Sequence, residues 1–159
     1  MIRAAIFCLA AACTMQAPVA AQAQTSEEAL VGKWDCKARR GRGLAMRLLL
    51  NYNENKYFIH RANVAAGDRR GRIDASLTIS GRWRIKGNVL AERLTNARMT
   101  AFTINGKDVS NTSFGRLASE SVKNEIVGPD SLSNMKIKFQ GPNKMRLVDG
   151  TFTANCAKR

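Results

Sequence analysis

The most regular feature of the chain is an alternation of apolar and polar residues between residues 73 and 86. Every second position carries Ile, Ala, Leu, Gly or Trp, and the positions between them carry Asp, Ser, Thr, Arg or Lys. This period of two predicts a long strand with one buried face. A tight turn at Ser80 and Gly81 would put Ile79 opposite Arg82 on the same face, so we interpret Gly81 as a bend within one continuous strand. Long bent strands are typical of barrels.

The same reasoning predicts strands along most of the remaining chain. They cover residues 30–36, 44–50, 56–60, 89–94, 98–104, 135–139, 144–148 and 151–156, with turn signals rich in Asn, Gly and Asp between most of them. The exception is the segment 112–127, where Phe114, Leu117 and Val122 form a helical stripe. The pattern favours an all-β fold, either a sandwich or an antiparallel up-and-down β-barrel of about eight strands, with one short helix.

The N-terminus has the organisation of a secretory signal peptide. Arg3 is its only charged residue, an apolar run extends from Ala4 to Met15, and an Ala-x-Ala site ends at Ala23. We therefore expect residues 1–23 to be removed, which leaves residues 24–159 as a single domain in the periplasm or secreted. In an alternative that stays open, Cys13 is the lipidated residue of a lipoprotein. No later segment is apolar enough for a transmembrane helix.

Two cysteines, Cys36 and Cys156, lie outside the predicted signal peptide. An even pair in an oxidising compartment predicts a disulfide. The bond would join the first and last predicted strands, and because bonded cysteines lie within about 7 Å of each other, these strands should be neighbours. This favours the closed barrel over the sandwich. Two cysteines and the single histidine, His60, are too few for a structural metal site.

The first strand contains Gly32-Lys33-Trp34, and this Gly-x-Trp motif resembles the start of the lipocalin-like (calycin) barrels. With Gly81-Arg82-Trp83 in mid-chain and a final strand that carries a cysteine, residues 28–159 resemble the small exported lipocalin-like domains of bacteria. The resemblance implies an eight-stranded meander around a cup, with Trp34 plugging the closed end. From burial statistics alone, we expect Trp34 and Trp83 to serve core packing.

A repeated Arg-Arg-Gly-Arg sequence is the most distinctive candidate binding feature. Its arginines are Arg39, Arg40 and Arg42 in the first copy and Arg69, Arg70 and Arg72 in the second. In an up-and-down barrel both copies fall in loops at the same end, so six guanidinium groups would gather at one rim. Such clusters suit phosphates, sulfates or carboxylates, and the formal net charge of +14 also favours an anionic partner. A solvated basic surface would explain the same residues without any ligand.

Catalytic motifs are not evident in the sequence. We expect His60, in a predicted strand, to be packed or at the rim, and no nucleophile, metalloprotease or phosphate-loop motif occurs. No cofactor is indicated, so we expect a protein that is not an enzyme. Nucleic acid is disfavoured by the predicted export and by the small number of aromatic residues among the basic ones.

Three functions are compatible with the sequence. The first is a non-catalytic binding protein of the bacterial envelope that engages an anionic envelope component or an acidic protein through the arginine-rich rim. The second is a carrier of a small apolar ligand within the barrel. The third is an inhibitor or accessory subunit of another envelope protein.

Overall fold

The computed structural model describes residues 26–40, 44–68, 71–128, 131–150 and 152–159. Its elements, in chain order, are α1 (Ser26–Leu30), β1 (Gly32–Arg40), β2 (Leu44–Tyr52), β3 (Tyr57–Asp68), β4 (Gly71–Lys86), β5 (Val89–Ile104), β6 (Lys107–Asp108), α2 (Ser113–Ile126), β7 (Leu132–Phe139), β8 (Lys144–Asp149) and β9 (Phe152–Lys158). The predicted signal peptide lies outside the described residues. None of the helices in the described ranges is long and apolar enough to span a membrane.

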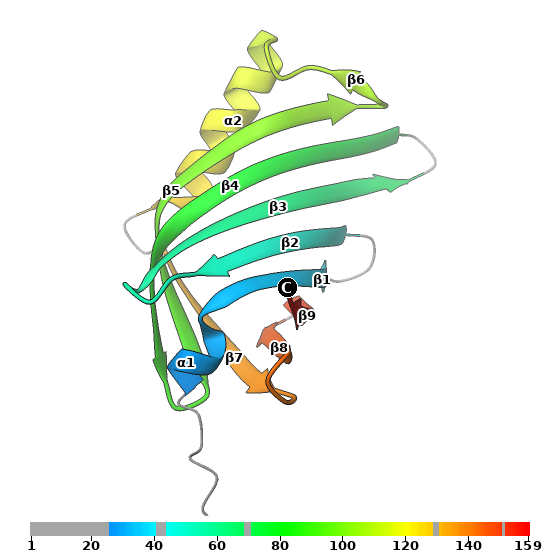
Figure 1. Ribbon diagram of the computed structural model, residues 1–159. Helices are drawn as coiled ribbons and strands as arrows, with labels where there is room; N and C mark the ends of the chain where they lie inside the picture. The colour runs from blue at the N-terminus through cyan, green and yellow to red at the C-terminus, as the bar shows by residue number, and fades with distance from the viewer. Residues whose placement is uncertain (1–25, 41–43, 69–70, 129–130, 151) are drawn as a thin grey trace, which may run out of the picture.

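The strands form one closed antiparallel barrel (Figure 1). Each strand from β1 to β5 pairs with its neighbours in sequence, β5 pairs with β7, and β7, β8 and β9 continue the meander back to β1. Eight strands close the barrel, and the two-residue β6 adds a short extra strand beside β5. The predicted all-β barrel of about eight strands is confirmed.

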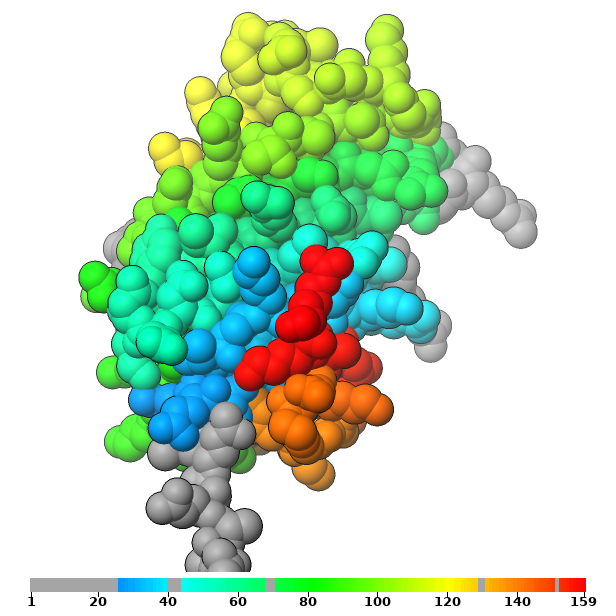
Figure 2. All heavy atoms as spheres, in the orientation of Figure 1, coloured from blue at the N-terminus to red at the C-terminus, as the bar shows by residue number. Residues whose placement is uncertain are grey.

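The disulfide between Cys36 and Cys156 lies at the closure between β1 and β9. The two residues are direct partners in the antiparallel register, with Cα atoms 4.0 Å apart. Figure 2 shows the C-terminal residues, in red, lying against the N-terminal strand, in blue. The predicted bond and the predicted contact between the first and last strands are both confirmed. A cross-link over 120 residues stabilises the fold by about 5 kcal/mol at most in the chain-entropy model.

Strand β4 bends at Gly81 as predicted. The pairing of β4 with β5 shifts register between Ser80 and Gly81 and again between Ser76 and Leu77. At Gly81 a Cβ atom would lie 1.9 Å from the carbonyl oxygen of Arg93 and 3.0 Å from Cζ of Phe58. Only glycine therefore permits this approach of β5 to β4.

One strand prediction was wrong. The segments 89–94 and 98–104 were expected to be two strands, whereas β5 runs without interruption from Val89 to Ile104. The register shifts opposite β4 absorb the break in apolar alternation near Thr95 and Thr100, because a bulge inserts one residue without ending a strand. A sequence pattern that changes phase at a bulge looks like two strands.

The closed end of the barrel is filled by side chains. Trp34, Phe58 and Leu90 are fully buried there, and burial of each such side chain stabilises the fold by roughly 1.5–3 kcal/mol. The indole of Trp34 donates a hydrogen bond to the carbonyl oxygen of Leu30 at 2.8 Å, which holds α1 against this end. Trp83 is also buried, and its indole donates to the carbonyl oxygen of Asn53 at 3.2 Å.

The glycine of the Gly-x-Trp motif has a backbone role. Gly32 adopts a φ of +127°, and a Cβ atom there would lie 2.9 Å from Cε of Lys158. Glycine populates this region at little cost. It lets the chain turn from α1 into β1 while the ammonium group of Lys158 lies over the Trp34 ring, 5.3 Å from its centroid.

Helix α2 confirms the predicted helix at residues 112–127. Thr112 is its N-cap, since the side-chain oxygen accepts a hydrogen bond from the backbone nitrogen of Gly115 at 3.1 Å. Phe114 stacks on Phe102 of β5, with ring centroids 6.0 Å apart. Leu117 nevertheless stays 66% exposed, so the apolar stripe of α2 is only partly covered.

Replacing Gly81 with alanine tests the requirement for close strand contact at the bend. We expect Gly81→Ala to destabilise the protein by about 1–3 kcal/mol, because the added methyl group forces β4 away from the Arg93 carbonyl. The measurement is the free energy of unfolding from urea denaturation. Gly128→Ala is the matched control, since the nearest atom to its Cβ position is 3.8 Å away. Equal stability of the two variants would contradict this account of the bend.

Candidate functional site

An open cup occupies the barrel interior above the filled end. The cavity has a volume of about 680 Å³, within the range of roughly 300–1,000 Å³ of small-molecule sites. Most of its wall is apolar, and the residues that contribute aliphatic or aromatic side chains are Leu44, Met46, Leu48, Leu50, Ala62, Ile79, Leu94, Ile126, Leu132, Met135, Leu147 and Phe152.

The unequal length of the strands explains why the interior is open on one side. β7 pairs only with the first part of β5, from Val89 to Arg93, so the rest of β5 has no partner from β7. Helix α2 lies beside this part of β5 (Figure 1). Its last turn, at Glu125 and Ile126, lines the cavity. The helix therefore forms part of the cup wall where the sheet is incomplete.

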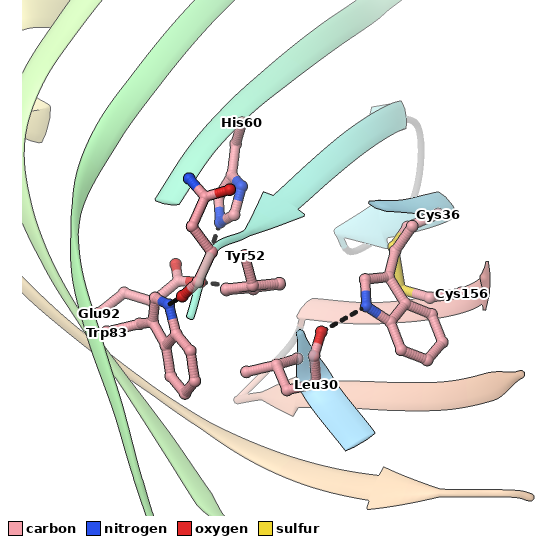
Figure 3. Close-up of polar contacts among 9 residues, drawn as sticks. Leu30, Cys36, Tyr52, His60, Trp83, Glu92 and Cys156 are labelled. Carbon is pink, nitrogen blue, oxygen red and sulfur yellow. Dashed lines mark hydrogen bonds and ion pairs between the residues drawn. A yellow bond between two sulfur atoms is a disulfide. The ribbon is translucent and has the colours of Figure 1, made fainter. Parts of the chain in front are cut away.

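Three polar side chains meet on the inner wall of this cup. Figure 3 shows Tyr52, His60 and Glu92 pointing toward one another from β2, β3 and β5. The Tyr52 hydroxyl donates to Oε1 of Glu92 at 2.6 Å, and Nε2 of His60 lies 3.0 Å from the same oxygen. Tyr52, His60 and Glu92 are 1%, 7% and 4% exposed, and all three line the cavity. We call them the polar trio.

Aromatic packing fixes the orientation of the trio. The His60 ring stacks on Phe58 with centroids 4.3 Å apart and meets Tyr52 edge-on at 4.9 Å. Nδ1 of His60 is buried and has no hydrogen-bond partner among the described residues. Burial, reinforced by the neighbouring Glu92 carboxylate, raises the pKa of Tyr52 well above its ordinary value. Tyr52 is thus a neutral hydrogen-bond donor at physiological pH.

The sequence did not reveal Tyr52 and Glu92 as site residues. Tyr52 lies 40 residues from Glu92 in the chain, and His60 lies 32 residues from it. Only the closed sheet brings them together. One signal was present: Glu92 occupies an inward position between Leu90 and Leu94, where alternation predicts an apolar residue. His60 was expected to be packed or at the rim, and the structure places it in the cup wall.

The six arginines of the repeated sequence are only partly described. Arg42, Arg69, Arg70 and the side chain of Arg40 lie outside the described residues. Arg39 and Arg72 occupy outward positions of β1 and β4, since the buried Trp34, Cys36 and Ala38 mark the inner face of β1. Both line one hollow of about 820 Å³ on the outer surface. Thus one arginine from each copy borders the same outer hollow.

Two cations of this hollow are already paired within the chain. Arg72 binds Asp74 at 2.8 Å, and Arg47 binds Asp35 at 2.7 Å. Hydrogen bonds from these guanidinium groups lower the pKa of both carboxyl groups. Lys37 and Arg39, which also line the hollow, have no ion-pair partner among the described residues. They are the cations that remain available to a ligand.

Among the residues that the structure describes, acidic, histidine and cysteine side chains do not gather into a candidate metal site. Within the described ranges, no three such residues are close enough together to hold a metal ion.

Replacing Tyr52 with phenylalanine tests the buried hydrogen bond. Above pH about 10, tyrosine in an unfolded chain releases its proton, while Tyr52 in the folded chain retains it. The stability that Tyr52 confers is therefore fully present below that pH. It is lost as the pH rises toward the pKa of Tyr52 in the folded state. We expect Tyr52→Phe to cost about 1.5–3 kcal/mol at pH 7 and to lose stability less steeply than the native chain above pH 10. Urea denaturation at pH 7 and above pH 10 measures the free energy of unfolding of both proteins. If the native chain and Tyr52→Phe lost stability equally steeply above pH 10, the raised pKa of Tyr52 would be contradicted.

Comparison with known proteins reveals similarity at the level of the fold. No protein-family model matches the chain, and no curated protein matches it. A lipocalin-like protein from Bacteroides uniformis is similar in structure, with 14% identity and a TM-score of 0.44 over 82% of this chain and 99% of that one. An uncharacterized protein from Bacteroides eggerthii has 15% identity and a TM-score of 0.45 over 81% of this chain and 98% of that one. The closed eight-stranded meander, with Gly-x-Trp at the start of its first strand, gives this chain a lipocalin-like fold.

Proposed function

We propose that this protein is a non-catalytic binding protein that holds a small, mainly apolar molecule in its cup. The observation that carries the proposal is a cavity of about 680 Å³ with mostly apolar walls and one buried polar cluster. This combination is what small-molecule sites need, because apolar walls supply affinity and a few polar groups fix orientation. The core at the closed end holds the wall rigid.

Features outside the cup also fit a carrier. The disulfide favours an oxidising compartment, which agrees with an exported protein. The exposed Leu117 on α2 and the half-exposed Leu132 at the start of β7 lie on the two elements that border the incomplete side of the sheet. Apolar side chains at this border would ease the entry of an apolar molecule.

Two adjacent leucines on β2 provide a matched test of cup binding. Leu48 lines the cavity, while Leu49 occupies the outward position next to it. We expect Leu48→Trp to weaken binding of the neutral apolar dye N-phenyl-1-naphthylamine by about tenfold, or 1.4 kcal/mol, because the indole fills the cup. Leu49→Trp should leave the affinity within about twofold. Fluorescence titration measures both. Equal affinities in the two variants would rule out the cup as the binding site.

A second candidate function is engagement of an anionic partner on the outer face. The register puts five outward residues side by side across neighbouring strands, namely Lys138, Arg146, Asn155, Lys37 and Arg47. We call them the basic row. Arg47, opposite Lys37, is paired with Asp35. Like charges directly opposite each other are destabilising, as at Lys138 with Arg146. An anionic partner would relieve this repulsion, and the row continues into the hollow lined by Arg39 and Arg72.

Paired lysine substitutions test the basic row. We expect the double substitution Lys37→Gln and Lys138→Gln to weaken binding of dextran sulfate. It should also reduce the magnitude of the slope of log affinity against log salt concentration by about 1.5, because each lost ionic contact reduces that magnitude by roughly 0.7–0.9. Lys107→Gln with Lys123→Gln is the control, because it removes the same charge from β6 and α2. Calorimetric titration at several salt concentrations gives the slopes. Equal loss in both double variants would show attraction by net charge alone and would refute a site on the row.

A further inference from the structure

The charged residues that line the cup are all acidic. They are Glu92, Glu125 and Asp149, and no lysine or arginine of the described chain is among the lining residues. The whole chain has 26 Lys and Arg residues against 12 Asp and Glu residues, so a random choice of charged residues would give mostly basic ones. Among the described residues, lysines and arginines lie outside the cup, whereas the cup is lined by three acidic side chains. A ligand in the cup meets this local charge rather than the net charge.

The hydrogen bonds of the polar trio converge on one oxygen of Glu92. Oε1 of Glu92 receives the Tyr52 hydroxyl at 2.6 Å and lies 3.0 Å from Nε2 of His60. An ionised carboxylate accepts hydrogen bonds at both oxygens, and the two lone pairs of one oxygen are enough for both of these bonds. His60 then donates from Nε2–H, and its Nδ1 is an unpaired acceptor in the neutral ring.

The second ring nitrogen of His60, Nδ1, has no hydrogen-bond partner among the described residues. A protonated imidazole would leave a buried, charged N–H group without an acceptor among the described residues. A protonated ring would pair with Glu92 through Nε2 and leave only its second N–H group without a hydrogen bond, whereas a neutral ring leaves only an acceptor unpaired. The trio contains no lysine or arginine, so a carboxylate charge on Glu92 has only the Tyr52 hydroxyl and the His60 ring beside it. That charge is buried beside an apolar cavity whose described lining residues include no lysine or arginine.

A ligand with a cationic head would complete this arrangement. A protonated amine placed beside Glu92 would pair with the carboxylate in a poorly solvated site, where such pairing is strong. A carboxylate or phosphate head would instead be repelled there. The amine's alkyl body would lie along the aliphatic wall formed by strands such as β2 and β8.

Surface charge does not oppose this preference strongly. The basic side chains of the outer face are exposed, and at physiological salt the interactions of exposed charges fall off over about 8 Å. Glu92 is 4% exposed, so its interaction with a head group in the cup is screened far less. The local carboxylate therefore outweighs the distant lysines and arginines.

We infer that the molecule bound in the cup is an amphipathic amine, with an apolar body against the aliphatic wall and a protonated amino group beside Glu92. This inference rests on the proposed cup-binding function. It adds the chemical class of the ligand and assigns Glu92 as the residue that selects it.

Three molecules with the same chain and different heads provide the test. Dodecylamine, dodecanol and dodecanoate are each titrated, below their aggregation limits, against protein loaded with N-phenyl-1-naphthylamine at pH 7. We expect dodecylamine to displace the dye at about tenfold lower concentration than dodecanol, and dodecanoate to be the weakest competitor. Leu48→Trp should weaken all three, which establishes that they compete in the cup.

Glu92→Gln tests the residue assignment. The amide keeps the shape of the side chain and removes its charge, so the preference for dodecylamine over dodecanol should fall to within about twofold while dodecanol still displaces the dye. Circular dichroism checks that the variant is folded. If it does not fold, Glu125→Gln at the exposed rim removes one acidic lining residue instead, and should lower the amine preference by a smaller factor.

The outcomes separate the two proposals. Dodecanoate binding in the cup as well as or better than dodecylamine would overturn the amine inference and leave the cup function intact. An amine preference that survives Glu92→Gln unchanged would overturn the assignment to Glu92. Failure of all three molecules to displace the dye, together with equal dye affinity in Leu48→Trp and Leu49→Trp, would instead refute the cup itself.

Discussion

The antiparallel pairing of β1 with β9 is the contact that gives the sheet an inside and an outside. Before closure the sheet has two free edges and two faces; afterwards the strand positions that share a face with Cys36 and Cys156 point to the interior. Because direct partners share a face, this assignment passes from strand to strand around the barrel. The disulfide holds the two edges in the register that makes the assignment consistent. The cup, the filled end and the outer basic row all follow from it.

Closure also separates charges that lie next to each other in sequence. Glu92 and Arg93 are adjacent in β5, yet Glu92 is buried within the polar trio and Arg93 is exposed. The alternation of a strand sends neighbouring side chains to opposite faces. A strongly basic chain can therefore enclose an acidic interior. The net charge, which can be read from the composition, is dominated by the residues of the outer face and does not indicate the charge inside the cup.

Local patterns predicted the features that depend on neighbours in sequence. Alternation between Ile73 and Ile85 identified β4 and its bend at Gly81, and a helical stripe identified α2. The disulfide and the closure of the barrel could also be inferred, since the two cysteines that follow the predicted signal peptide have few alternatives to pairing with each other. The single long β5 was missed because a bulge shifts the phase of alternation without breaking hydrogen bonding to β4. Predicting the length of a strand therefore requires knowledge of its pairing with the partner strand as well as its own sequence.

The candidate site was harder to predict because it depends on pairing between distant strands. His60 was the only one of the three polar residues that stood out in the sequence, and its type alone does not distinguish a packed ring from a site residue. The role of His60 becomes clear once β3 is placed beside β2 and separated from β5 only by β4. Glu92 then provides a hydrogen-bond partner, and Phe58 provides a stacking surface. An inward-facing glutamate costs stability unless it is hydrogen-bonded. The two hydrogen bonds to Glu92 compensate for part of its desolvation. They leave its carboxyl group in the wall of an apolar cavity, the position in which we propose that a cationic head group binds.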